Sequence, residues 1–205
     1  MYFQFALKIT GRVRFYDLNN GKIIIDGTDI KKFSLKNLRS QVSLVSQDIF
    51  LFADSIYNNI SLFNKSISRI EVENAAKEIG IFDFIKKLPG GFDYNVKERG
   101  VMLSEGQRQL ISFLRAYVSN PKILILDEAT SSIDSKTEQL IQYATNKIIA
   151  DKTSIIIAHR LSTILNSDKI IYLENGEIKE VGTHQELINI NRGYYKKLFE
   201  YQFKE

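Results

Sequence analysis

Two adjacent carboxylates follow an entirely apolar run in this chain, at a point where acidic side chains can do chemistry. The run is Ile123–Leu126, and Asp127 and Glu128 come directly after it. A run that is apolar at every position predicts a strand covered on both faces, and ligands of parallel sheets bind at the carboxyl ends of the strands. One carboxylate there could hold Mg²⁺, and a second could orient or deprotonate a water molecule. Taken alone, such a pair is more often a turn or a helix cap.

A second candidate is the start of a helix that the sequence predicts from Ser104 onward. Ser104 offers a hydroxyl, the first backbone N–H groups of a helix can bind an anion, and Gly106 permits close approach. The alternative is a plain N-cap, with Glu105 placed favourably for the helix dipole. The residues alone leave both interpretations open.

Two more polar side chains follow predicted strands. His159 comes after the run Thr153–Ile157, and its imidazole could donate to a phosphate oxygen. Gln47 follows Val42–Ser46, and its amide could reach a metal-bound water or the nucleophile. A lone histidine or glutamine is usually structural. Four such groups at strand ends or at an adjoining helix start together indicate a site.

The elements that must position these groups alternate short β-branched runs with helical patterns. This alternation is typical of an α/β domain with a largely parallel sheet. Near the end of the chain Asn175-Gly176 favours a type I′ turn, so Ile170–Glu174 and Glu177–Val181 should form a hairpin. The sequence predicts its clearest strands over 22–26, 42–46, 122–126, 153–157 and 169–173.

The helices are predicted from capping signals and apolar stripes. Ser135 and Glu138 have the spacing of a capping box, with Ser135 as N-cap. Arg69–Ile79 is predicted as a helix that ends at Gly80. From 49 to 120 the pattern is almost all helical, which indicates a helical lobe inserted into the α/β core. The stripe behind the capping box consists of Leu140, Ile141, Ala144 and Ile148.

Taken in order, these motifs resemble those of the ABC (ATP-binding cassette) ATPases. Gln47 corresponds to the Q-loop, and the remaining motifs are LSEGQRQL (103–110, signature), ILILDEATSSID (123–134, Walker B and D-loop) and IIIAHRLSTI (155–164, histidine switch). The segments between them resemble the lipid- and drug-exporter branch: RFYD (14–17), IIIDGTDI (23–30), SQDIFLFADSI (46–56), ERG (98–100) and ENGEIKEVGTH (174–184). The likeness covers roughly residues 14–203 and implies a P-loop NTPase-like α/β core with a helical subdomain and a C-terminal β-hairpin and helices.

The resemblance implies a catalytic role for four residues. Asp127 and Gln47 help to hold Mg²⁺, with Gln47 also sensing the nucleotide. Glu128 polarises the attacking water, and His159 contacts the γ-phosphate of ATP. The implied reaction is attack of water on that phosphate, with motion driven by sandwich dimerisation.

The resemblance also implies two protein partners. One is a second ABC ATPase domain, in a homodimer or a heterodimer, with Asp134 crossing the interface. The other is the transmembrane domain of an exporter, which places the chain in the cytoplasm at the inner face of the plasma membrane. The residues implied to face an ATP bound on the second domain are Ser104, Gly106 and Gln107. Those implied to touch the membrane domain are Glu98, Arg99 and Gly100.

The family's phosphate-binding loop, G-x-x-x-x-G-K-[ST], is absent from the residues upstream of RFYD. An ungapped count places Phe5 at the lysine and Ala6 at the Mg²⁺-binding hydroxyl, so we expect a cassette shortened at its N-terminus, with 1–13 as an atypical segment. Each charge-assisted contact of that loop is worth about 1.5–3 kcal/mol. Losing three or four weakens binding by more than ~10³-fold, so we expect the chain alone not to hydrolyse ATP. Glu105 also replaces the first of the signature's two glycines.

Composition excludes several other classes of protein. The 205 residues contain no cysteine, so disulfide frameworks and thiolate metal sites are excluded. The net charge of +4 is modest and scattered, which argues against a nucleic-acid partner. Neither a membrane-length apolar run nor a secretory signal is predicted.

We expect a single domain over 1–205, with 14–48 and 121–205 as the α/β core and 49–120 as the helical subdomain. Two alternatives to a transport ATPase remain. The first is a non-catalytic partner subunit or gene fragment that supplies only its signature and D-loop to another chain. The second is an ABC ATPase of DNA repair or translation, against which the exporter-like segments argue.

Overall fold

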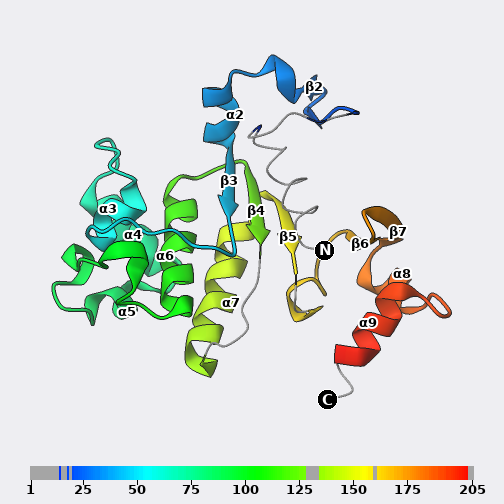
Figure 1. Ribbon diagram of the computed structural model, residues 1–205. Helices are drawn as coiled ribbons and strands as arrows, with labels where there is room; N and C mark the ends of the chain where they lie inside the picture. Colours follow the sequence, from blue (N-terminus) through cyan, green and yellow to red (C-terminus); the bar gives the residue numbers. More distant parts are fainter. Residues whose placement is uncertain (1–13, 15–17, 19, 128–133, 159–160, 203–205) are drawn as a thin grey trace. The chain divides into compact units, whose positions relative to one another are not determined.

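The computed structural model describes residues 14, 18, 20–127, 134–158 and 161–202 (Figure 1). The chain forms two compact units. One is the continuous stretch Lys36–Ile157, and the other combines Met1–Leu35 with Ala158–Glu205. Most of the residues singled out from the sequence belong to the continuous unit.

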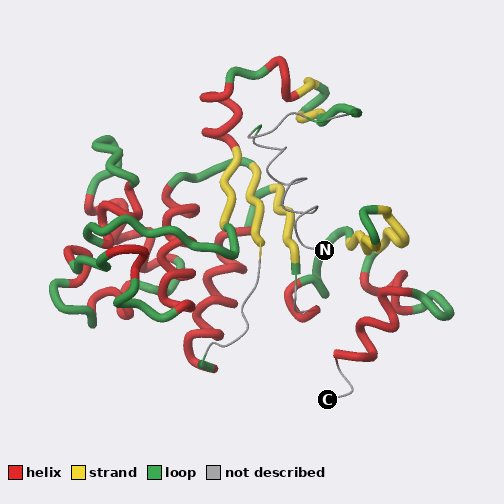
Figure 2. The backbone as a smooth tube through the Cα atoms, viewed as in Figure 1, coloured by secondary structure: helices red, strands yellow, loops and turns green. Residues whose placement is uncertain are grey.

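A three-stranded parallel sheet organises the unit Lys36–Ile157. Its strands are β3 (Val42–Val45), β4 (Ile123–Asp127) and β5 (Thr153–Ile157), with β4 in the middle (Figure 2). The three predicted strands of this unit are confirmed to within a residue at each end. Strand β4 is the most buried of the three, as its unbroken apolar run predicts, with exposed fractions of 0%, 0% and 3% at Leu124, Ile125 and Leu126.

Helices of the same unit pack beside this sheet (Figure 1). They are α2 (Leu35–Gln41), α3 (Ile56–Ser61), α4 (Arg69–Glu78), α5 (Phe82–Lys86), α6 (Glu105–Val118) and α7 (Ser135–Ile149). Helices α6 and α7 pack against each other, and α6 also packs on β3 (Figure 1). Short 3₁₀ turns lie at Gly91–Asp93 and Glu98–Gly100. One apolar core joins α3, α4, α6, α7 and β4, so the helices predicted over 49–120 share their core with the sheet.

The start of α7 corrects one expectation. Asp134, not Ser135, is the N-cap, because its Oδ1 accepts a hydrogen bond from the Thr137 N–H at 3.0 Å. Aspartate is as good an N-cap as serine. Asp134 lies one residue before Ser135, and three residues after Asp134 comes Thr137, whose N–H is free to donate. The apolar stripe behind it is confirmed, with Ile141, Ala144 and Ile148 buried.

Within its described residues the second unit contains two antiparallel hairpins and two helices. Strands β1 (Ile24–Ile25) and β2 (Thr28–Asp29) form the first hairpin, and β6 (Ile170–Glu174) and β7 (Glu177–Gly182) form the second. Helices α8 (His184–Ile188) and α9 (Tyr194–Gln202) follow, and 3₁₀ turns lie at Ile30–Lys32 and Leu161–Thr163. A small core made by Leu161, Ile170, Leu187 and Tyr195 holds this part together.

The two hairpin turns test the turn predictions. Asn175 and Gly176 have φ of 50° and 81°, which confirms the predicted turn with positive φ at both positions. The strand predicted over 22–26 is present but shorter, as Ile24–Ile25, because the chain reverses at Asp26 and Gly27, whose φ values are 48° and 75°. Asp-Gly is the same kind of turn signal as Asn-Gly. None of the helices in the described part of the chain is long and apolar enough to cross a membrane.

Candidate functional site

The carboxyl ends of β3 and β4 lie level at one edge of the sheet. Val45, the last residue of β3, pairs with Leu126, so Asp127 ends β4 one position further along. Gln47 follows Val45 by two residues and is exposed, whereas Asp127 is half-buried. The parallel register therefore brings these two predicted site residues to neighbouring strand ends, as the sequence pattern required.

The third strand reaches the same edge. Ile157, the last residue of β5, pairs with Asp127, so the chain leaves β5 beside the end of β4. The two other predicted catalytic residues, Glu128 and His159, lie outside the described residues.

A carboxylate and an amide oxygen at one sheet edge fit the oxygen ligands that Mg²⁺ prefers. In the described ranges no cluster of three or more His, Cys, Asp or Glu side chains could hold a metal. Magnesium commonly binds to one or two carboxylates together with water and phosphate oxygens, so the donors Asp127 and Gln47 suit an ion that arrives with a nucleotide.

Helix α6 begins with a reciprocal capping box. The Ser104 hydroxyl accepts a hydrogen bond from the Gln107 N–H at 3.3 Å, and Gln107 Oε1 accepts one from the Ser104 N–H at 3.0 Å. The N–H groups of Glu105 and Gly106 have no acceptor among the described residues. The N-cap interpretation is therefore confirmed, and two further donors at the helix start are left for an anion.

The loop before α6 is held close to two other segments. Gly100 is buried with φ of 69°, and a Cβ there would lie 2.8 Å from Leu51 Cδ1 and 3.1 Å from Arg108 Cδ. Leu51 belongs to the segment that follows Gln47, and Arg108 belongs to α6. The side chains of Glu98 and Arg99 are exposed. The segment that follows Gln47 thus meets Gly100 and α6, from which it is far apart in the sequence.

Asp134 has a defined local role, because it caps α7. Hydrogen bonds from the Thr137 side chain and backbone hold the pKa of the Asp134 carboxyl below its ordinary value. The residue caps the helix and is still exposed to solvent. A role in capping therefore leaves room for a contact with a partner.

Sequence reasoning missed a buried polar group beside the site. Asn59 is fully buried, and its side chain accepts from the Phe52 N–H at 2.8 Å and donates to the Phe52 and Ser55 carbonyls, each at 3.0 Å. Arg115 of α6 donates from Nε to the Asn59 carbonyl at 2.8 Å. Together they fix the segment after Gln47 to α3 and α6. A signal existed, because Asn59 interrupts the apolar positions Ile56 and Ile60 on one helix face.

Comparison with known proteins gives the family. The model described as "ABC transporter" matches residues 9–131. Two relatives that are named as multidrug export ATP-binding/permease proteins come from Staphylococcus aureus and Bacillus subtilis (YgaD). Their sequences are 49% and 47% identical to this chain. Each alignment spans 189 residues, which are 92% of this chain and 32% of the relative. The chain thus spans about a third of the length of these curated relatives.

A solved structure agrees with these relatives. The structure of a bacterial Atm1-family ABC exporter with ATP bound matches with a TM-score of 0.88 and 42% identity, over 98% of this chain and 35% of the other. This match confirms the predicted α/β fold of an ABC ATPase. Because the family model also matches more than half of the sequence, the chain belongs to the ABC transporter family.

Proposed function

We propose that this chain is the ATP-binding part of an ABC exporter. The observation that carries the proposal is the sheet edge where Asp127 ends one parallel strand and Gln47 follows the neighbouring one. Polar groups at that place serve a ligand at the carboxyl ends of the strands. In this proposal Asp127 and Gln47 hold Mg²⁺, which supplies charge neutralisation on the phosphates, while Glu128 polarises water and His159 contacts the γ-phosphate.

The start of α6 would serve an ATP molecule bound to a second ABC ATPase domain. Ser104, Gly106 and Gln107 are the residues of that contact, and the unpartnered N–H groups of Glu105 and Gly106 support it. Asp134 would cross the same interface. The partner domain belongs to a second copy or to a related chain.

The other partner in this proposal is a transmembrane domain. The relatives in Staphylococcus aureus and Bacillus subtilis are named as joint ATP-binding and permease proteins, and this chain matches a third of their length. Glu98, Arg99 and Gly100 would meet the membrane domain together with Gln47, at the inner face of the plasma membrane. Because Gly100 packs on Leu51 and on Arg108 of α6, a contact of the membrane domain with Gly100 would be linked to α6.

The 205 residues contain no G-x-x-x-x-G-K-[ST] loop, and we propose that they do not hydrolyse ATP by themselves. In that case the chain contributes the α6 side of a composite site, and another chain contributes the phosphate loop.

A mixing experiment tests the composite site. The chain is added to an intact relative, such as Bacillus subtilis YgaD, whose own signature serine has been replaced so that its ATPase activity is low. We expect the added chain to raise the ATPase rate, and Ser104→Ala to reduce that effect. Ser68→Ala is the matched control, because Ser68 caps α4 in the same way.

Two outcomes decide the proposal. An ATPase rate that stays unchanged on mixing would refute the composite site. ATP hydrolysis by the chain alone, abolished by Glu128→Gln, would show instead that it is a complete enzyme.

A further inference from the structure

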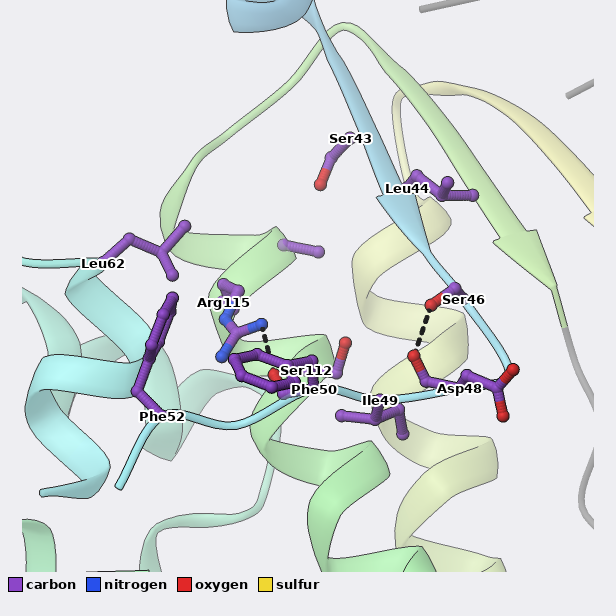
Figure 3. Close-up of a pocket in the computed structure, with 11 residues that line it drawn as sticks. Ser43, Leu44, Ser46, Asp48, Ile49, Phe50, Phe52, Leu62, Ser112 and Arg115 are labelled. Atoms are coloured by element: carbon purple, nitrogen blue, oxygen red, sulfur yellow. Dashed lines mark hydrogen bonds between the residues drawn. The ribbon is translucent and has the colours of Figure 1, made fainter. Parts of the chain in front are cut away.

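The cavity of about 310 Å³ between β3, α6 and the segment that follows β3 adjoins a site already described (Figure 3). Asp48, the residue after Gln47, lines this cavity together with Phe50 and Arg115, so the cavity belongs with the surface proposed to meet a membrane domain. Helix α9, by contrast, takes part in none of the proposed roles. It belongs to the other unit and is hydrogen-bonded to the turn that follows His159.

This hydrogen bond joins the last residue of α9 to the first residue of a 3₁₀ turn. The Leu161 N–H donates to Gln202 Oε1 at 3.1 Å, across 41 positions of the sequence. Leu161 begins the turn Leu161–Thr163, so its N–H has no acceptor inside that turn. An N–H that is removed from water without an acceptor costs about 1–3 kcal/mol. Gln202 therefore supplies the acceptor that the turn itself cannot provide.

Helix α9 also meets this turn through an apolar core. Leu161 and Tyr195 are 4% and 1% exposed, and they share that core with Ile170 and Leu187. The Leu161 carbonyl in turn accepts a hydrogen bond from the Ile164 N–H at 3.0 Å. Both the backbone and the side chain of Leu161 are therefore fixed, two residues after His159.

The other end of α9 is fixed to the hairpin of β6 and β7. The Glu180 carboxylate of β7 accepts hydrogen bonds from the Tyr194 and Tyr195 N–H groups at 2.8 and 2.9 Å. A carboxylate is favourable at the N-terminal end of a helix, because that end carries a partial positive charge. Tyr172 of β6 stacks on Tyr194, with 5.5 Å between the ring centroids. These contacts do not depend on Gln202.

The middle of α9 is held by the start of α8. His184 Nδ1 and the Tyr195 hydroxyl oxygen lie 2.8 Å apart, and the centroids of the His184 and Phe199 rings lie 5.2 Å apart. Helix α9 is thus fixed at its start and in its middle, and its last side chain reaches the turn after His159. A change at Gln202 should therefore release the turn without releasing the helix.

We propose that Gln202 is a positioning residue for His159. Its amide oxygen fixes the Leu161 N–H and thereby limits where the chain can place the His159 imidazole. This inference rests on the proposed contact of His159 with the γ-phosphate, and it adds that the C-terminal helix controls that contact. Such control matters because a misplacement of about 1 Å in a catalytic group can lower a rate about 100-fold.

The test uses the two histidines of the chain, His159 and His184. NMR of the isotope-labelled full chain without nucleotide gives one imidazole signal for each, assigned through its connection to the backbone signals. The signal of His159 reports on the proposed positioning. That of His184 reports on α9, because its ring contacts Tyr195 and Phe199 of that helix. The exchange rate of the Leu161 amide hydrogen with solvent measures the hydrogen bond itself.

One substitution removes the acceptor and a second one restores it. Gln202→Met keeps the length of the side chain without the amide oxygen, so the His159 signal should shift while the His184 signal stays in place. The Leu161 amide should exchange about tenfold faster, which corresponds to one lost hydrogen bond. Gln202→Glu keeps an oxygen acceptor at the same position and should return both readouts to the wild-type values.

The matched control is Glu200→Met. Glu200 is an exposed residue of α9 with a side chain of the same length, and among the described residues it forms no hydrogen bond with the turn. We expect this variant to leave the His159 signal and the Leu161 exchange rate unchanged.

Three results would overturn the proposal. The first is a Gln202→Met variant with unchanged Leu161 exchange and an unchanged His159 signal. The second is an equal shift of the His159 and His184 signals, which would show that Gln202 only holds α9 in place. The third is a Gln202→Glu variant that behaves like Gln202→Met. Because no nucleotide is present, a failure of the proposed γ-phosphate contact would leave these readouts unchanged and would show only in ATPase measurements.

Discussion

Helices α4 and α6 begin with the same hydrogen-bonding pattern and differ in one side chain of it. In α4 the Ser68 hydroxyl accepts from the Glu71 N–H at 3.2 Å, and the Glu71 carboxylate accepts from the Ser68 N–H at 2.6 Å. In α6 Ser104 and Gln107 form the same pair of bonds at 3.3 and 3.0 Å. The side chain that accepts a hydrogen bond from the N–H of the N-cap serine is thus a carboxylate in α4 and a neutral amide in α6.

This difference decides what the helix start can bind. The N-terminal end of a helix carries a partial positive charge, and a carboxylate placed there neutralises it. Glu71 does so in α4, and hydrogen bonds from the Ser68 backbone and side chain lower its pKa. Helix α8 uses Glu186 in the same way, so among the reciprocal capping boxes of the described residues that of α6 is the neutral one. A neutral cap stabilises the helix and adds no negative charge to that of Glu105 in the same turn.

The segments leading into the two helices also differ. Leu62, ahead of α4, has φ 50° and ψ 41°, in the ordinary left-handed region. Lys97, ahead of α6, has φ 60° and ψ −176°, a conformation that essentially only glycine adopts without strain. Strain of this kind concentrates at functional segments, and here it precedes the loop proposed to meet a membrane domain.

The largest expected effect is that of Gln107→Glu, which gives α6 the cap of α4. In the mixing assay we expect the stimulation by this chain to fall about 100-fold, the scale of losing one phosphate-stabilising group, because the new carboxylate repels the phosphate. Unfolding by urea should show unchanged or higher stability. Glu105→Gln is the matched control, since it removes a charge from the same turn and should raise the stimulation. Equal stimulation by Gln107→Glu would refute the argument from the neutral cap.

The next effect is that of Gly100→Ala. The added Cβ would meet Leu51 and Arg108, and the residue has a left-handed φ, so we expect the free energy of unfolding to fall by about 2 kcal/mol. Urea denaturation measures this change. Gly21→Ala is a suitable control, because Gly21 has φ of 83° and an added Cβ would have no other atom within 4 Å. A loss no greater than that control would contradict the close packing of the loop on α6.

Lys97→Gly should act in the opposite direction. Relief of the strained backbone is expected to raise the free energy of unfolding by about 1 kcal/mol, after the entropy that glycine adds to the unfolded chain. The comparison variant is Leu62→Gly, where the ordinary left-handed conformation offers less strain to relieve. If both substitutions destabilise the protein alike, Lys97 is not the strained position.

The smallest effect concerns pH. The pKa of Glu71 is lowered in the folded chain, so its contribution to stability is full above its ordinary value of 4.5 and is lost as the pH falls through the lower folded value. Glu71→Gln should therefore lower urea stability slightly near neutrality, change it little in acid, and so make it less dependent on pH. Gln107→Glu should make it more dependent. The same acid dependence in wild type and Glu71→Gln would show that Glu71 is not a charged cap.

Regular features of the site were predictable from the sequence because they depend on short-range signals. The apolar run before Asp127 specifies a buried strand, parallel strands align their carboxyl ends, and Ser104 marks a helix start. The register between β3 and β4 brings Asp127 and Gln47 to neighbouring strand ends, and that register follows from the same apolar runs.

Other features depended on choices between near-equivalent signals or on long-range contacts. Asp134 and Ser135 are both good N-caps, and only the backbone geometry decides between them. The strand before the turn at Asp26 and Gly27 was predicted too long, through Asp26, because apolar residues precede the turn. The pairing of Arg115 with the segment of Phe50 joins residues that are far apart in the sequence, so no local pattern could have predicted the cavity.

The most direct test of the central claim is calorimetric titration of the purified 205-residue chain with Mg²⁺-ATP up to millimolar concentration. The account predicts no detectable binding, because α6 and the edge of the sheet offer only part of a phosphate site. Micromolar binding would contradict it, and the chain would then have to be treated as a complete ATPase.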